Sequence, residues 1–116
     1  MSRDTTYLRH IREALVRAIS HARHGRERFL LDRDTQDAAI RNLEVAGEAA
    51  KRVSASLRHS HPEVPWGTLA RLRDVLIHQY MNVDIAAIWD DLTLHVPSVI
   101  DSVDRILAEI QEGGPD

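Results

Sequence analysis

The sequence contains no cysteine, so disulfide bonds, thiolate metal sites and cysteine nucleophiles are all excluded. It also lacks any apolar run near the ~20 residues that a helix needs to span a bilayer. The first ten residues, MSRDTTYLRH, have no apolar centre of the kind found in signal peptides. We therefore expect a cytoplasmic protein that does not enter membranes. No glycine-rich, phosphate-cradling loop is present either, so we predict no cofactor and no binding of ATP by this chain alone.

The composition is that of a single globular domain. The chain has 116 residues, 43% of them hydrophobic and 28% charged, which is enough for one hydrophobic core spanning residues 1–116. Its net charge of −3 is unevenly distributed, since residues 1–33 hold eight arginines against four acids and residues 84–116 hold one arginine against eight acids. These segments could form a positive and a negative face, or simply be solvated helix surfaces.

Apolar residues recur at steps of three and four in five segments, which indicates amphipathic helices. Two long helices are expected to start near Asp4 or Thr5 and near Asp34 or Thr35, with Gly25 ending the first. The prolines of HSHPEVPWG (59–67) then interrupt the chain. Three shorter helices follow, over 68–80, from an Asp84 cap, and from Pro97. The sequence predicts an all-α bundle of about five helices whose inward residues are Leu8, Ile11, Leu15, Ala18, Ala22, Ala39, Leu43, Ala46, Ala50, Val53, Leu57, Leu69, Leu72, Leu76, Ile85, Ile88, Trp89, Leu92, Ile100, Val103, Leu107 and Ile110.

The stretch RLRDVLIHQY (71–80) places Arg73, His78 and Tyr80 at fixed offsets on the third helix. An arginine fork fits phosphate oxygens in a two-point contact, and histidine can take or give a proton near neutral pH. Together they suffice for attack of an RNA 2′-hydroxyl on its neighbouring phosphate, with His78 moving the proton and Arg73 stabilising the phosphorane. Tyr80 could bind phosphate or itself be a target. The alternative is an ordinary helix end with polar decoration.

Helix geometry sets a condition on this chemistry. Arg73 and His78 lie about 140° apart around an α-helix and ~7.5 Å apart along it, so they do not share a face. Either the helix loosens near His78, or a second copy of the chain supplies part of the site. A twofold homodimer that pairs this helix with itself would bring two sets together.

The same stretch resembles the R-x4-H-x-Y motif of the HepT-like toxins, a branch of the HEPN superfamily. AAIRNLEVAGEAAKRV (38–53) resembles the family's second helix, and VPW (64–66) resembles the start of its motif helix. RDVLIHQYMNVD (73–84) resembles the motif region, and Trp89 falls where the family often has tryptophan. The resemblance covers roughly residues 38–100, in the expected order.

This resemblance implies an all-α HEPN domain, usually dimeric, whose paired motifs line a cleft at the dimer interface. It implies a toxin that is a metal-independent endoribonuclease, with Arg73 and His78 catalytic and Asp74 orienting one of them. It also implies an antitoxin partner, a minimal nucleotidyltransferase of the MntA type, which in some systems transfers AMP to the motif tyrosine. Tyr80 would be the modified residue here.

Two other hypotheses stand beside the enzyme. In one, the chain is a helical module that docks a nucleotidyltransferase and presents Tyr80 without cleaving RNA. In the other, it is a purely structural helical dimer. If RNA is bound, the basic first third could track its backbone, with these candidate contacts: Arg9, Arg12, Arg23 and Arg26.

Several other residues are assigned structural roles. His21, His24, His59 and His61 match no metal-site spacing, so no metal is predicted. Glu44 and Glu48 are expected to form salt bridges to Arg41, Lys51 or Arg52. Gly47 in mid-helix indicates close helix packing there, within the chain or across a dimer. Trp66 and Trp89 are expected to anchor the core.

Overall fold

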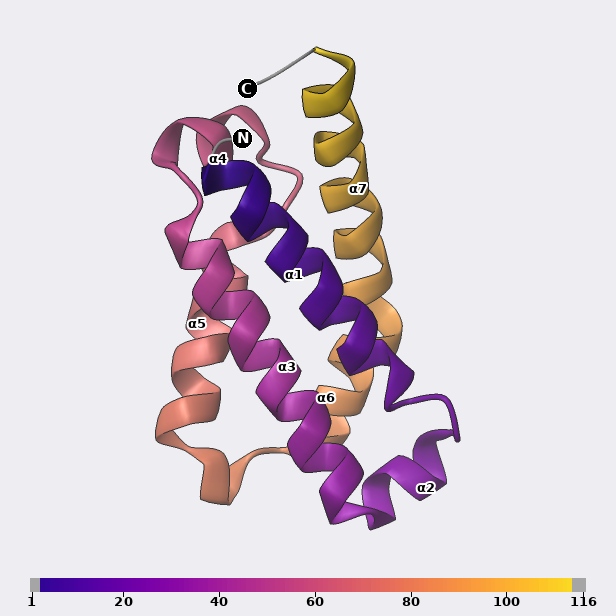
Figure 1. Cartoon of the computed structure of the whole chain (residues 1–116). Helices are drawn as coiled ribbons and strands as arrows, with labels where there is room; N and C mark the ends of the chain where they lie inside the picture. Colours follow the sequence, from indigo (N-terminus) through magenta and orange to yellow (C-terminus); the bar gives the residue numbers. More distant parts are fainter. Residues whose placement is uncertain (1–2, 114–116) are drawn as a thin grey trace.

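The computed structural model describes residues 3–113 and contains helices and loops, with no strand among those residues, as the all-α prediction requires. Four helices run along the length of the molecule: α1 (Arg3–Ser20), α3 (Arg33–Arg52), α5 (Trp66–His78) and α7 (Val96–Glu112) (Figure 1). The shorter helices are α2 (Arg26–Leu31), α4 (Ala55–Ser60) and α6 (Ile85–Asp90). None of the described helices is both long and apolar enough to cross a membrane.

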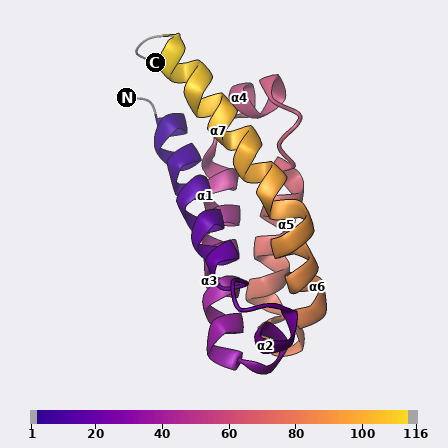
Figure 2. The same ribbon diagram turned by 90° about the vertical axis from the view of Figure 1, so that its right-hand side faces the viewer.

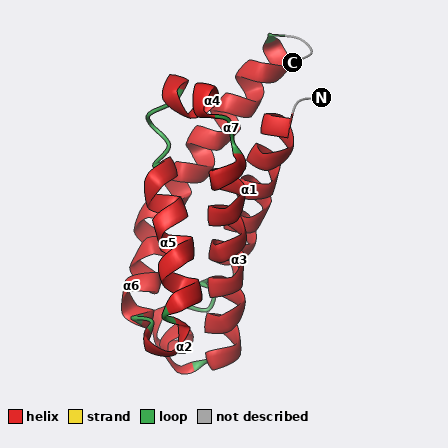
Figure 3. Ribbon diagram, turned by 90° about the vertical axis from the view of Figure 1, so that its left-hand side faces the viewer, coloured by secondary structure: helices red, strands yellow, loops and turns green. Residues whose placement is uncertain are grey.

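The long helices pack side by side in the order α7, α1, α3, α5. Figure 1 shows this order across the molecule, with α1 between α7 and α3 and α3 between α1 and α5. From one side α7 lies in front, next to α1 (Figure 2), and from the other side α5 lies next to α3 (Figure 3). Short helices occupy the ends, α4 at one and α2 at the other (Figure 1). Helix α5 stands at the edge of this arrangement, with α3 as its main neighbour. One side of α5 is therefore packed, while the opposite side faces outward.

The core follows the predicted stripes of the first two segments closely. Leu8, Ile11 and Leu15 of α1 are fully buried against the small residues of α3, among them Ala46 and Ala50. The alanines let the two helices approach closely, as the sequence pattern indicated. Both tryptophans contribute as expected, and the indole N–H of Trp66 donates to the His61 carbonyl at 2.9 Å.

The prediction for the second helix is wrong about the residue at which the helix ends and about the residue that caps its start. Helix α3 ends at Arg52 rather than near Leu57, because Val53 turns to an extended conformation and Ser54 caps the new helix α4. Ser54 also binds both carboxylate oxygens of Asp4, at 2.8 and 2.6 Å, which ties this break to the start of α1. At the other end the cap is Asp32, whose side chain accepts from the Thr35 N–H, and not Asp34 or Thr35.

The last two expected helices form one continuous helical rod. Asp84 caps α6 as predicted. A π-helical segment (Asp91–His95) then joins α6 to α7, with the Val96 N–H donating to the carbonyl of Asp91, five residues back. Pro97 follows this wider turn directly, so the rod continues where a new helix was expected to begin. Of the predicted stripe of α7, Val103 is fully buried, and Ile100, Leu107 and Ile110 are partly buried against the core. The most buried face also includes Val96, Val99 and Ile106, because the apolar pairs at 99–100 and 106–107 widen the apolar side of the helix.

The basic and acidic thirds of the chain lie next to one another. Helix α1 packs along α7, and the guanidinium of Arg12 forms an ion pair with Asp104 across that contact. Part of the positive charge of α1 is thus balanced by α7. The two charged segments are therefore neighbours in the fold.

Candidate functional site

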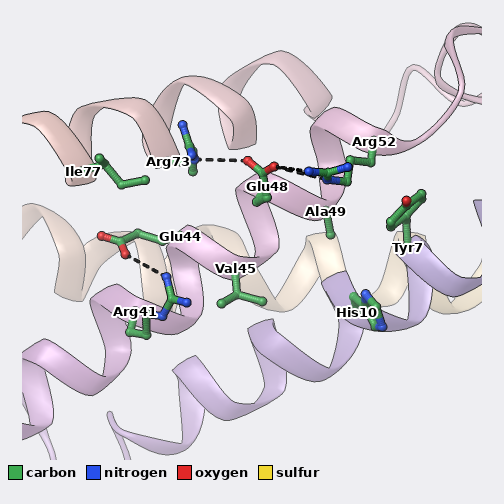
Figure 4. Close-up of a pocket in the computed structure, with 10 residues that line it drawn as sticks. All are labelled: Tyr7, His10, Arg41, Glu44, Val45, Glu48, Ala49, Arg52, Arg73 and Ile77. Atoms are coloured by element: carbon green, nitrogen blue, oxygen red, sulfur yellow. Dashed lines mark hydrogen bonds and ion pairs between the residues drawn. The ribbon is translucent and has the colours of Figure 1, made fainter.

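Arg73 lies on the flank of α5 that packs against α3. Its Nε is 3.3 Å from Oε2 of Glu48, and Glu48 also pairs with Arg52 at 3.1 Å (Figure 4). The Arg73 Nε–H is buried and makes no hydrogen bond with any described residue, since the Glu48 contact is an ion pair without hydrogen-bond geometry. Arg73 is therefore held in place by charge, and the terminal N–H groups that do not bind Asp74 keep donor capacity for another anion.

Asp74 holds Arg73 from the other side. Its carboxylate accepts from Nη1 of Arg73 at 2.9 Å and lies 3.8 Å from Nζ of Lys51. The hydrogen bond from Arg73, together with Lys51, keeps the pKa of the Asp74 carboxyl below its usual value. The same contact, aided by Glu48, raises the pKa of Arg73. Both groups are therefore charged at neutral pH.

His78 is the last residue of α5, and its side chain is exposed. Its Nδ1 lies 2.8 Å from the main-chain oxygen of Asp74. A carbonyl oxygen can only accept, so Nδ1 carries the proton in this contact and Nε2 of the neutral ring is left with a free lone pair. Asp74 thus binds Arg73 through its carboxylate and His78 through its backbone.

Arg73 and Tyr80 line two different hollows of the chain, and His78 lines neither of these two. Arg73 lines a surface hollow of about 250 Å³ between α1, α3 and α5, which His78 does not line (Figure 4). Tyr80, in the 3₁₀ turn after α5 (Tyr80–Asn82), is 67% exposed and lines an adjoining hollow with Arg41 and Glu44. The helix ends only after His78, so the separation of Arg73 and His78 around α5 agrees with the geometry of an intact helix.

The predicted phosphate contacts of the first third lie elsewhere. Arg12 is paired with Asp104, and Arg23 donates to the carbonyl of Ser20 at 2.7 Å. Arg9 is exposed on α1, and Arg26 is the first residue of α2. None of these four arginines lines either of the two hollows that contain Arg73 and Tyr80.

Two features near Arg73 were only partly visible in the sequence. The pairs Arg41–Glu44 and Arg52–Glu48 form as expected, but the contact of Glu48 with Arg73 joins residues distant in the chain and has no local signal. Gly47 was the available clue. A side chain there would overlap Cβ of Arg73 and lie 2.6 Å from the carbonyl oxygen of Leu69, so the expected close packing is that of α3 on α5 within one chain.

Within residues 3–113, no group of three or more histidine, cysteine or acidic side chains is placed to hold a metal ion. His61 pairs instead with two carboxylates, Glu63 at 3.3 Å and Glu109 at 4.0 Å, and His95 pairs with Asp91 at 3.1 Å.

The family model and the relatives that match this chain are all named as ribonucleases or putative RNases. A family model described as Ribonuclease HepT-like matches residues 6–106. A Methanocaldococcus jannaschii protein named "Putative RNase MJ0127" is 42% identical over 85 residues, which cover 73% of this chain and 70% of that protein. "Probable ribonuclease HepT" of Thermococcus cleftensis is 45% identical over 73 residues, covering 63% of this chain and 66% of that protein. "Putative RNase TTE0752" of Caldanaerobacter subterraneus is 33% identical over 108 residues, covering 92% and 96%. No solved structure matches this chain.

Proposed function

The chain belongs to the HepT-like ribonuclease family, and from that membership we propose that it is a metal-independent endoribonuclease, the toxin of a toxin–antitoxin pair. The observation that carries the proposal is the double contact of Asp74, which positions the Arg73 guanidinium and the His78 imidazole at once. An ordinary helix end has no need of a half-buried arginine that pairs with two carboxylates, next to the residue whose main-chain oxygen fixes a histidine tautomer.

The reaction is attack of an RNA 2′-oxygen on the adjacent phosphorus. Nε2 of His78 accepts the 2′-hydroxyl proton, the new P–O2′ bond forms, and the P–O5′ bond breaks. The departing 5′-oxygen takes up a proton from water, and protonated His78 returns its proton to water, so that the products are a 2′,3′-cyclic phosphate, a 5′-hydroxyl and the neutral imidazole. Arg73 donates to the phosphorane oxygens, where negative charge increases in the transition state. No step requires a metal ion.

We place the complete site at a twofold dimer interface. The outward side of α5 carries His78 with Val75, three residues before it and 47% exposed, and Ile77 is 38% exposed nearby. Exposed apolar side chains beside a polar site are typical of surfaces that pair with another chain. Pairing of α5 with its copy would set His78 of one chain near Arg73 of the other.

Control of the toxin is assigned to Tyr80. Its exposed hydroxyl could be reached by an MntA-type nucleotidyltransferase bound to the chain. With Mg²⁺-ATP from that partner, the phenolic oxygen attacks the α-phosphorus, pyrophosphate leaves, and the phenol loses its proton. An adenylyl group at Tyr80 would then stand beside Arg41 and Glu44, which also line the Arg73 hollow, and would block access to it.

The decisive experiment is cleavage of a panel of small RNAs in EDTA by wild-type protein shown to be unmodified by intact mass. We expect cyclic-phosphate ends, and loss of cleavage in His78→Ala. The matched control is His95→Ala, another exposed histidine bound to a residue four positions earlier, which should cleave normally. If unmodified, dimeric wild-type protein cleaves no RNA, the second candidate, a docking module that presents Tyr80, replaces the enzyme.

A further inference from the structure

One face of α3 carries charged residues along its whole length. The two adjoining hollows described above share Arg41 and Glu44, and their charged residues on α3 are Arg33, Asp37, Arg41, Glu44, Glu48 and Arg52. From Arg33 to Arg52 this face is about 28 Å long, at 1.5 Å per residue. We call it the α3 groove. Helix α1 borders the groove on one side and α5 borders it on the other, and the side chain of Arg73 lines it (Figure 4).

The arginines of the groove form ion pairs with neighbouring acids, and these pairs use only some of their N–H donors. Arg41 pairs with Glu44 at 3.5 Å, and Arg52 pairs with Glu48 at 3.1 Å. Exposed pairs of this kind contribute little and are readily exchanged for another partner. Each guanidinium has five N–H donors, and these pairs use one or two of them. The acids thus keep the arginines in a row while leaving donors for phosphate oxygens.

Aromatic rings lie at both ends of the groove. Tyr7 and His10 of α1 form an edge-to-face pair, with ring centroids 6.2 Å apart, beside Arg52. At the far end the exposed ring of Tyr80 lies beside Arg33 and Arg41. The arginines stand among three acids of α3, and aromatic rings lie at both ends. Such a groove offers the two contacts by which proteins bind single-stranded nucleic acid, with phosphates on the cations and bases stacked on the rings.

We propose that the α3 groove is the RNA track of this protein, and that a single strand lies along it with its phosphates on Arg41 and Arg52 and a base against Tyr7. The track leads the strand past Arg73. This inference rests on the proposed function for the identity of the strand, and it moves the phosphate contacts away from Arg9, Arg12, Arg23 and Arg26. Those arginines lie outside the groove, and Arg12 is already paired with Asp104 of α7.

The test is binding of a 2′-O-methyl oligouridine, which cannot be cleaved by 2′-oxygen attack. Affinity is measured over a range of salt concentrations for wild type and for Arg41→Gln and Arg52→Gln. Each variant should weaken binding on the order of 5–10-fold at low salt and lower the slope of log K against log [salt] by about 0.7, the contribution of one phosphate contact. The matched controls are Arg23→Gln and Arg26→Gln, equally exposed arginines outside the groove, which should leave affinity and slope unchanged.

A second arm separates stacking from charge. Tyr7→Leu should weaken binding by about fivefold or more without changing the salt slope, because the ring contributes no charge, whereas Tyr7→Phe should bind like wild type. Melting temperatures of all variants establish that the fold is intact.

Three outcomes would overturn the proposal. Arg41→Gln and Arg52→Gln could bind like wild type while Arg23→Gln and Arg26→Gln lose affinity, which would return the track to the first third of the chain. They could alter self-association in sedimentation while leaving RNA affinity unchanged, which would make the groove a protein interface. The proposal would also be refuted if the wild-type protein cleaves RNA and every variant binds the probe as tightly as wild type does. Groove-dependent binding by a protein that cleaves nothing counts instead against the proposed function alone.

Discussion

Gly47 of α3 and Arg73 of α5 are in direct contact, and the contact exists only because Gly47 has no side chain. A Cβ there would overlap Cβ of Arg73 and come within 2.6 Å of the Leu69 carbonyl oxygen. Neither obstacle is the free end of a side chain that could turn away. The glycine therefore sets the distance between α3 and α5, and with it the position of Arg73 next to Glu48.

Gly47→Ala should destabilise the fold despite the better helix propensity of alanine. Overpacking costs about 1–3 kcal/mol and the propensity gain is at most about 1 kcal/mol, so we expect a net loss of about 1–2 kcal/mol. Thermal denaturation should show Tm lower by roughly 5–10 °C. Gly67→Ala is the control, since a Cβ there meets nothing within 4 Å and should leave Tm equal or higher. Equal Tm values for Gly47→Ala and wild type would mean that α5 can shift freely.

Arg73→Lys should nearly abolish RNA cleavage while preserving the charge. Lysine offers a compact ammonium in place of the planar fork, so it cannot keep Asp74 and bind a phosphorane in two-point contact. We expect kcat to fall about 100–1,000-fold, as for loss of an oxyanion donor. Arg71→Lys, two residues earlier on the exposed side of α5, should cleave normally. Near wild-type cleavage by Arg73→Lys would remove Arg73 from the chemistry.

Local patterns in the sequence were sufficient for the fold class and for most of the core. The steps of three and four located the buried residues of α1 and α3 correctly, because each of these helices has a single apolar stripe. For α7 the same reasoning found only part of the buried face, because adjacent apolar pairs make that face wider than a single stripe. It also missed α2 and α4, since helices of six residues leave too few turns for a period to show.

The candidate site was predictable only up to the point where tertiary packing begins. Spacing alone gave the separation of Arg73 and His78 around α5. The ion pair of Glu48 with Arg73 joins α3 to α5 and depends on the close packing at Gly47. Local sequence patterns therefore do not predict it. The α3 groove was hidden for the same reason, because its charges are dispersed along α3 and its aromatic end comes from α1.

Acid should release Arg73 from Asp74. The pKa of Asp74 is lowered in the folded state, so its contribution to stability is present above the unfolded carboxyl pKa of about 3.9 and is lost as the pH falls through the lower folded value. Asp74→Asn should therefore be less stable than wild type at neutral pH, and the two unfolding free energies should converge below about pH 4. Chemical denaturation across this range measures the difference. Curves that stay parallel to low pH would mean that the Arg73 contact does not stabilise the fold.

Tyr80→Phe should prevent adenylylation and leave cleavage intact. Incubation with the proposed nucleotidyltransferase partner and Mg²⁺-ATP should add one adenylyl group to wild type, as read by intact mass, and none to Tyr80→Phe. Tyr7→Phe changes the other tyrosine, which is half-buried on α1, and should still be modified. Adenylylation of Tyr80→Phe at another residue would place the control of this protein elsewhere.

Val75→Glu should separate the proposed dimer and make cleavage depend on protein concentration. Val75 lies on the outward side of α5, one turn before His78, so a carboxylate there would be buried without a partner if α5 pairs with its copy. We expect the dimer Kd to rise at least about tenfold, which sedimentation velocity can measure. Cleavage should be lost where the variant is monomeric and return where it is dimeric, since each active site would need groups from both chains. Leu31→Glu is the control, because Leu31 is 78% exposed on α2 and lies away from α5, and its dimerisation and cleavage should match wild type. A monomeric Val75→Glu that cleaves as fast as wild type would show that one chain holds the whole site, and Arg73 would then have to reach the phosphate beside its own His78 by a rearrangement of the end of α5.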